Sequence, residues 1–279
     1  MRCVYLNGAY VPADEATIPA QDAGVLFGRG VFETFRARQG SVYRLDQHLQ
    51  RLSVGAETLS IAPPATLSEL PRIVRELSRR CELDDARVRL TLTAGPEGGE
   101  PSLLIQAKPA TDYPPELYER GATAMVASAR RNETSPLARM KTLNYMDNVL
   151  AREAARSEGA DEAIILNSKG LVADGSAFNV FAIRDGTLRT PKVEDGALPG
   201  VTRGAVLELA SKAGIATEET TVGLDDLVGA EEAFLTNAIA GVMPLVSVDG
   251  EKIGVGTPGP MTRRLREMSE REAKSSCSA

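Results

Sequence analysis

Histidine is almost absent from this sequence: His48 is the only one in 279 residues. Ser-His-Asp, Cys-His and histidine-rich metal chemistries each need an imidazole in a fixed role. Most of those enzyme classes are therefore excluded unless His48 is itself the catalytic group. His48 lies in the segment LDQHLQRL, which has the pattern of an amphipathic helix start, so we predict a packing or capping histidine.

Cysteine is also scarce, and Cys3, Cys81 and Cys277 are widely scattered along the chain. An odd number at these spacings matches neither a zinc clamp nor a disulfide framework. We therefore predict no metal site and no structural disulfide.

Long apolar runs and runs of basic residues are missing too. The first residues, MRCVYLNGAYVPADE, are too polar and too interrupted for a signal peptide, and no stretch approaches a membrane span. The 32 basic and 38 acidic residues give a net charge of -6 without any lysine- or arginine-rich tract. We therefore expect a cytoplasmic protein that binds neither membrane nor nucleic acid.

The first part of the chain has the pattern of a sheet with helices beside it. Asn7-Gly8 and Gln39-Gly40 each predict a tight hairpin turn between alternating segments. Helical spacing predicts helices over 46–60 and 66–82, and alternation predicts paired strands over 87–93 and 103–108.

The second part is richer in strands. Helices are expected over 146–158, 201–213 and 260–273, and strands over 122–127, 232–236 and 242–248. The region 163–190 is expected to be rich in strands, with turns at Lys169-Gly170 and Asp185-Gly186. The polar tail 274–279 is expected to fray. Prolines without periodicity mark a linker, which divides the chain into a smaller domain (1–112), a linker (113–120) and a larger domain (121–279).

Three short segments together suggest a chemistry. Lys141 in KTLNY supplies an amine, Asp174 in VADGS supplies an acid, and Pro199-Gly200 leads into a helix whose free amides can hold an anion. A pyridoxal phosphate enzyme needs these three functions in one pocket, for the Schiff base, the ring nitrogen and the phosphate.

The order of six motifs resembles the class IV, fold-type IV pyridoxal phosphate enzymes, a family of branched-chain aminotransferases, D-amino acid aminotransferases and aminodeoxychorismate lyases. The likeness covers nearly the whole chain, and the motifs are HLQRL (48–52), KTLNY (141–145), GADEAIILN (159–167), VADGSAFNVF (172–181), LPGVTR (198–203) and FLTNAIAGVMP (234–244). The resemblance implies an α/β (α+β) enzyme with two domains that enclose pyridoxal 5'-phosphate, and a homodimer.

The resemblance also implies roles for individual residues. Lys141 would form the Schiff base and move the proton at the substrate's α-carbon. The remaining cofactor-binding residues would be Arg51 and Thr202 with the backbone of Val201 at the phosphate, Tyr145 at the phenolic oxygen, Asp174 at the ring nitrogen, and the backbone of Asn237 and Ala238. Asp174 departs from the family, which usually has glutamate there, and aspartate reaches roughly 1.5 Å less.

Substrate preference is less sharply defined. The resemblance places Phe32, Thr34, Arg36 and Arg89 on the substrate side, and Arg89 matches branched-chain enzymes. Ala94 stands where D-amino acid enzymes and typical lyases carry an arginine, whereas Thr34 and the 237–244 pattern favour the lyase branch. We expect transfer of an amino group between a branched-chain-like amino acid and a 2-oxo acid. The alternatives are an aminodeoxychorismate lyase that releases pyruvate to form 4-aminobenzoate, and a weakly active cofactor-binding relative.

Overall fold

Two compact units make up the chain in the computed structural model, which describes residues 3–111 and 113–277. The first unit comprises Met1–Thr111, Met140–Asn144 and Ala273–Ala279, and the second comprises Asp112–Arg139 and Tyr145–Glu272. Each unit contains one sheet with helices, so the predicted mixed α/β class is confirmed.

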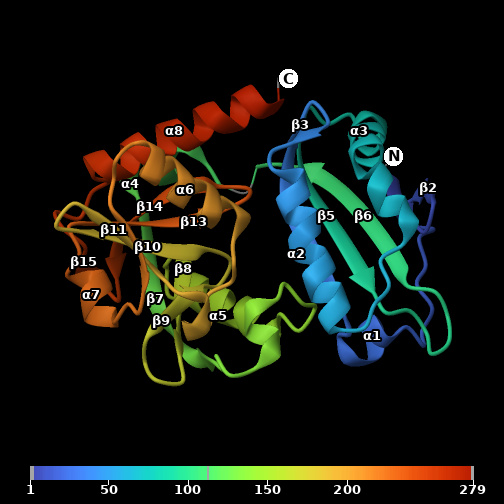
Figure 1. Ribbon diagram of the computed structural model, residues 1–279, viewed down its shortest axis with the longest axis horizontal. Helices are drawn as coiled ribbons and strands as arrows, with labels where there is room; N and C mark the ends of the chain where they lie inside the picture. The colour runs from blue at the N-terminus through green and yellow to red at the C-terminus, as the bar shows by residue number, and fades with distance from the viewer. Residues whose placement is uncertain (1–2, 112, 278–279) are drawn as a thin grey trace. The chain divides into compact units, whose positions relative to one another are not determined.

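The first unit contains an antiparallel sheet of six strands in the order β2-β1-β6-β5-β3-β4. Figure 1 labels β2, β3, β5 and β6 of this sheet. Its strands are β1 (Cys3–Leu6), β2 (Ala9–Pro12), β3 (Gly30–Arg38), β4 (Ser41–Val42), β5 (Asp85–Thr93) and β6 (Ser102–Pro109). The expected hairpin between β1 and β2 is confirmed, with φ of 46° at Asn7 and 98° at Gly8, the left-handed region that glycine and asparagine tolerate best.

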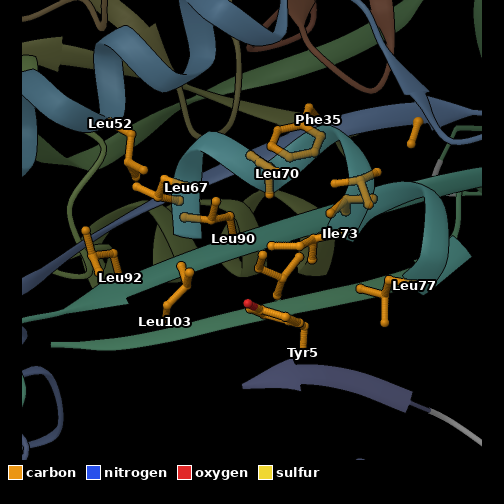
Figure 2. Packing of buried hydrophobic residues seen from close by; sticks show 14 of the residues in the cluster. Tyr5, Phe35, Leu52, Leu67, Leu70, Ile73, Leu77, Leu90, Leu92 and Leu103 are labelled. Atoms are coloured by element: carbon orange, nitrogen blue, oxygen red, sulfur yellow. The ribbon is translucent and has the colours of Figure 1, made fainter. Parts of the chain in front are cut away.

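Strand alternation places the core of this unit on one face of its sheet. In β5, Val88, Leu90 and Leu92 are fully buried, whereas Arg89 and Thr91 between them are half-buried. Helices α2 (Leu45–Thr58) and α3 (Leu70–Arg80) cover the apolar face, and Leu52, Ile73 and Leu77 pack there (Figure 2). A short helix, α1 (Ala23–Phe27), precedes β3.

The helix predicted over 66–82 is shorter than expected. A 3-10 helix covers Ala65–Glu69, and α3 begins only at Leu70 and ends at Arg80. Pro71 lies in the first turn of α3, where its missing N–H is not needed. Within a longer helix its ring would clash with the preceding turn, which explains the break.

Nine strands form the sheet of the second unit, in the order β12-β11-β10-β13-β14-β7-β8-β9, with β15 paired to β14. Its strands are β7 (Ala122–Arg131), β8 (Glu162–Asn167), β9 (Val172–Gly175), β10 (Asn179–Arg184), β11 (Thr187–Pro191), β12 (Thr217–Thr220), β13 (Glu232–Asn237), β14 (Gly241–Val248) and β15 (Glu251–Lys252). Its helices are α4 (Pro115–Arg120), α5 (Met146–Ser157), α6 (Val201–Lys212), α7 (Leu224–Val228) and α8 (Pro260–Cys277) up to Glu272, the rest of α8 being grouped with the first unit.

Strand β8 lies in the interior of the second unit, and all six of its residues are buried. Ile164 and Leu166 belong to one apolar cluster, whereas Ala163 and Ile165 belong to another that includes Ala155 of α5. Both faces of the strand are therefore covered, which explains why its sequence is apolar without alternation.

Two expected irregular segments contain helix. The segment predicted as a linker includes α4, whose Leu117 and Tyr118 pack against the second unit's core. Helix α8 continues to Cys277, although fraying was expected from residue 274; residues 278–279 of that tail lie outside the described part. In residues 3–111 and 113–277, no helix combines the length and the apolar character that a membrane crossing requires.

The segment Met140–Asn144 groups with the first unit, although the predicted boundary placed it in the larger domain. The Phe32 N–H donates to the Lys141 carbonyl at 2.9 Å, and the Leu143 N–H donates to the Gly30 carbonyl at 3.0 Å. Through these bonds the segment pairs with β3. This pairing places it in the first unit, although it lies far from β3 in the sequence.

Candidate functional site

Lys141 lies on the first unit beside Phe32. The backbone bond between these two residues fixes the position of the lysine, and its Nζ lies 4.5 Å from the centre of the Phe32 ring. Lys141 is half-buried and Phe32 is buried. An amine held in this way against an aromatic ring is shielded from part of the solvent, unlike an ordinary surface lysine.

The four expected substrate residues lie in one region of the first sheet. Phe32, Thr34 and Arg36 alternate along β3 and so share a face, and Arg89 pairs with Thr34 in the register of β3 and β5. The Arg89 guanidinium lies 3.8 Å from the Phe32 ring centre, so Phe32 contacts both Arg89 and Lys141. Arg36 donates two bonds to Asp85, from Nε at 2.6 Å and from Nη2.

Arg51 forms a forked ion pair with Glu33. Its Nε donates to Oε1 and its Nη2 to Oε2, both at 2.7 Å. Glu33 lies between Val31 and Phe35 on the core face of β3, opposite to the face of Phe32 and Thr34. Glu33 was not predicted as a site residue. A signal was present in the sequence, because a carboxylate on the apolar face of a strand is buried on folding and then needs a hydrogen-bonding or charged partner.

Asp174 is a buried carboxylate in β9 of the second unit, where 4% of its surface is exposed. Its Oδ1 accepts from Asn179 Nδ2 at 2.7 Å, and its Oδ2 accepts from the Leu198 N–H at 2.7 Å. Burial raises the pKa of Asp174 to about 7, although these two bonds and the charges of Arg131 and Arg203 oppose the rise. The carboxyl group can therefore exchange a proton near neutral pH.

Tyr145 lies immediately before α5 in the second unit and donates its hydroxyl hydrogen to the Ser176 carbonyl at 2.7 Å. Burial, followed by the negative charges of Asp174 and Glu162, raises the pKa of Tyr145. The phenol is thus a neutral hydrogen-bonding group. While its single hydrogen is given to Ser176, it can serve another group only as an acceptor.

Helix α6 begins at the expected anion site. Its N-cap is Gly200, which has no side chain with which to cap the first turn, so the Val201 and Thr202 N–H groups begin a helix of twelve residues. A Cβ at Gly200 would collide with Oδ1 of Asn179. Asn179 also donates to the Leu198 carbonyl at 2.8 Å. The start of α6 is therefore tied to Asp174 through Asn179. Asn179 lies in the VADGSAFNVF motif, but the sequence did not predict a role for it.

Asn237 shapes the turn between β13 and β14. Its Oδ1 accepts from the Ile239 N–H at 2.9 Å and from the Ala240 N–H at 2.7 Å. Its Nδ2 donates to the Tyr113 hydroxyl at 3.2 Å. The side chain thus holds the backbone of Asn237 and of the half-buried Ala238 in one conformation, beyond the main-chain contribution that was expected.

The structure groups the expected residues by unit. The first unit brings together Phe32, Thr34, Arg36, Arg89 and Lys141 and separately holds Arg51, whereas the second unit holds Tyr145, Asp174, Val201, Thr202, Asn237 and Ala238. Pyridoxal 5'-phosphate has an aldehyde, a ring nitrogen and a phosphate. A shielded amine at Lys141, a buried acid at Asp174 and a glycine-capped helix start at α6 match those three groups. Over the described ranges of the chain, no cluster of three or more His, Cys, Asp or Glu side chains could hold a metal ion.

Comparison with known proteins gives one consistent result. The family model for amino-transferase class IV matches residues 30–248. A putative branched-chain-amino-acid aminotransferase of Methanocaldococcus jannaschii is 37% identical over 95% of this chain and 94% of its own length. A D-alanine aminotransferase of Bacillus licheniformis is 31% identical over 94% of both chains.

A solved structure agrees with the sequence relatives. The branched-chain amino acid aminotransferase of T.th., determined with pyridoxamine 5'-phosphate, superposes with a TM-score of 0.89 at 29% identity. The match covers 98% of this chain and 94% of that one. The similarity therefore extends over both units and is not confined to one motif.

Proposed function

The chain belongs to the class IV aminotransferases, and from that premise we propose that it transfers an amino group between a branched-chain-like amino acid and a 2-oxo acid, with Lys141 as the lysine that binds pyridoxal 5'-phosphate. The observation that carries the assignment of Lys141 is its fixed position beside β3, where the bond from the Phe32 N–H to the Lys141 carbonyl holds it next to the Phe32 ring. An amine that must attack a carbonyl and then move a proton needs such a defined position.

When bound, pyridoxal 5'-phosphate supplies an aldehyde that takes up the amino group and a ring that accepts the electrons of the substrate's α-carbon. In our proposal Lys141 binds the aldehyde and then moves the proton at the α-carbon. Asp174 would face the ring nitrogen, where a carboxylate would keep that nitrogen protonated. The Asp174 carboxylate has a fixed position, since Asn179 and Leu198 bond both of its oxygens.

The phosphate is assigned to the start of α6, with the Val201 and Thr202 N–H groups, and to Arg51. A helix N-terminus offers free amides and a positive dipole end, and arginine adds a charged fork. Tyr145 is assigned to the phenolic oxygen, and the turn shaped by Asn237 and Ala238 offers backbone amides. Arg36, Thr34, Phe32 and Arg89 are proposed to line the substrate side.

The branched-chain preference is supported by relatives whose names specify that substrate and by Arg89. Because one relative is a D-alanine aminotransferase, D-amino acids should also be tested as amino donors. Ala94 argues against them, since it stands where enzymes for D-amino acids carry an arginine. The lyase alternative is less favoured, because both relatives described above match nearly the whole chain and are named as aminotransferases.

The experiment is a donor and acceptor screen on the purified holoenzyme. We expect turnover of branched-chain amino donors that depends on an added 2-oxo acid. Release of pyruvate from aminodeoxychorismate without any acceptor would replace the transaminase with the lyase. A visible band that stays unchanged with every donor, together with no turnover of aminodeoxychorismate, would leave only a weakly active cofactor-binding relative.

Lys141 has its own test. Borohydride reduction of the holoenzyme, followed by peptide mapping, is expected to leave the cofactor attached at position 141. Lys141→Ala should abolish transamination, whereas Lys169→Ala, at an exposed lysine, should not. A label on another lysine, or turnover by Lys141→Ala, would remove the assignment.

A homodimer and a cytoplasmic location belong to the same proposal. Helices α1 and α5 each expose three large apolar side chains, a feature typical of association surfaces. These are Val25, Leu26 and Phe27 on α1, and Met146, Val149 and Leu150 on α5. Sedimentation of the purified protein tests the assembly, and a monomer at micromolar concentration would contradict it.

A further inference from the structure

Glu33, His48 and Arg51 form a buried cluster in the first unit that the proposed reaction does not use. The Glu33 carboxylate accepts two bonds from Arg51 and a third from His48 Nδ1, at 2.8 Å to Oε2. The exposed side-chain fractions are 1% for Glu33, 3% for His48 and 12% for Arg51. A buried carboxylate with three donors is a fixed element, unlike the exposed ion pairs of α3.

The protonation of this cluster follows from its geometry. Burial alone would raise the pKa of Glu33, but the Arg51 charge and the bonds from His48 and Arg51 outweigh burial and lower that pKa to about 2. Glu33 is therefore ionised at neutral pH and can only accept hydrogen bonds. It follows that His48 carries a hydrogen on Nδ1 and donates it to Glu33.

The orientation of each partner is also defined. The forked bond fixes the plane of the Arg51 guanidinium, because two of its three nitrogens are bound to one carboxylate. The His48 ring packs against Phe35, with ring centres 5.5 Å apart, so His48 cannot follow a movement of Glu33 freely. His48 thus holds Glu33, and Glu33 holds Arg51.

We propose that Glu33, held by His48, is a positioning residue that fixes the Arg51 guanidinium for the cofactor's phosphate. The inference rests on the proposed function, because it takes Arg51 as a phosphate ligand. Loss of either support lets the guanidinium rotate, and a flexible arginine binds a phosphate less tightly because ordering it costs entropy. The effect is specific to the phosphate and does not extend to the aldehyde or the ring.

Comparing two ligands separates positioning from general stability. The full-length protein is freed of cofactor and titrated with pyridoxal 5'-phosphate and with pyridoxal, which lacks the phosphate. We expect Glu33→Gln to weaken the Kd for pyridoxal 5'-phosphate about tenfold and the Kd for pyridoxal less than about twofold. Equal losses for both ligands, or none, would overturn the proposal.

Glu76→Gln is the matched control, because Glu76 also pairs with two arginines, Arg79 and Arg80, on the surface of α3. It should leave both affinities unchanged. If it reproduces the phosphate-specific loss, the effect reports general charge and the proposal fails.

The only histidine of the chain gives a second readout in the unsubstituted protein. Nitrogen-15 spectra contain one imidazole, and we expect its Nδ1 to be protonated and its signals to shift with pyridoxal 5'-phosphate but not with pyridoxal. His48→Asn keeps a donor near the Nδ1 position and should preserve most of the phosphate preference, whereas His48→Leu should lose it. An unprotonated Nδ1, or identical shifts with both ligands, would contradict the proposal even if Glu33→Gln fails to fold.

Arg51→Gln separates the positioning role of Glu33 from the assignment of Arg51 to the phosphate. If it loses affinity for pyridoxal 5'-phosphate selectively and Glu33→Gln does not, the positioning role is wrong and the phosphate assignment stands. If Arg51→Gln shows no selective loss, the phosphate assignment of Arg51 is wrong, and the positioning role is wrong with it.

Discussion

The side-chain amide of Asn179 donates a hydrogen bond of 2.7 Å to Oδ1 of Asp174. The same amide also reaches the Leu198 carbonyl, and the Leu198 N–H returns a bond to Oδ2 of Asp174. The acid proposed for the ring nitrogen and the helix start proposed for the phosphate are thereby parts of one hydrogen-bonded structure. A change at one of them is expected to affect the other.

The charge of the side chain at position 174 is expected to affect kcat more than the length of that side chain. Asp174→Asn removes a preorganised charge from a buried site and should lower kcat about a hundredfold. Asp174→Glu keeps the charge and should stay within about tenfold of the parent enzyme. Steady-state kinetics measure both, and Asp161→Asn, which breaks an ion pair with the largely exposed Arg120, is the control. Full activity in Asp174→Asn would contradict the role.

The stability of the cofactor-free protein should depend on pH through Asp174. Its pKa is about 7 in the folded state against an ordinary value of 3.8, so the folded protein holds a proton that the unfolded chain has released. This contribution is fully present below about pH 4 and is lost as the pH rises to 7, by at most about 1.4 kcal/mol per pH unit.

The measurement is urea unfolding of the parent protein and of Asp174→Asn at several pH values between 4 and 8. Asparagine does not titrate, so the difference in the free energy of unfolding between the two proteins isolates the carboxyl group. A difference that is constant over this range would show that burial does not raise the pKa.

Gly200, the N-cap of α6, and Gly204, inside that helix, should respond in opposite ways to substitution by alanine. Gly200→Ala places a methyl group against Asn179 and should weaken cofactor binding at least tenfold, because the start of α6 must move. A Cβ at Gly204 would have no described heavy atom within 4 Å, and Gly204→Ala should raise stability by about 0.5–1 kcal/mol. Cofactor titration and thermal unfolding test the pair, and similar behaviour of the two variants would contradict the prediction.

Arg89 is expected to act through its planar fork. Arg89→Lys keeps the charge but loses stacking on Phe32 and bidentate bonding to a carboxylate, so the KM for the 2-oxo acid should rise about tenfold with kcat little changed. Arg87→Lys, two residues away on the same strand, is the control. A fall in kcat at unchanged KM would instead indicate that Arg89 acts on the chemical step.

Local patterns predicted most of the secondary structure. Alternation identified β5, and Asn7-Gly8 identified the first hairpin, because both signals depend only on neighbouring residues. The prediction of a helix over 66–82 was wrong about where the helix begins: α3 starts at Leu70, because Pro71 must lie in its first turn. The segment expected as a linker carries α4, since its apolar residues pack against a core that local sequence does not reveal.

The sequence by itself determined the mixed fold class, the family and the candidate amine, acid and anion cradle, because each is carried by residues close together along the chain. The tertiary structure decided that Lys141 joins the sheet of the first unit, that Glu33 is paired with His48 and Arg51, and that Asn179 ties Asp174 to Leu198. Those contacts join residues far apart in sequence or buried charges that need partners, and only folding brings such groups within hydrogen-bonding distance.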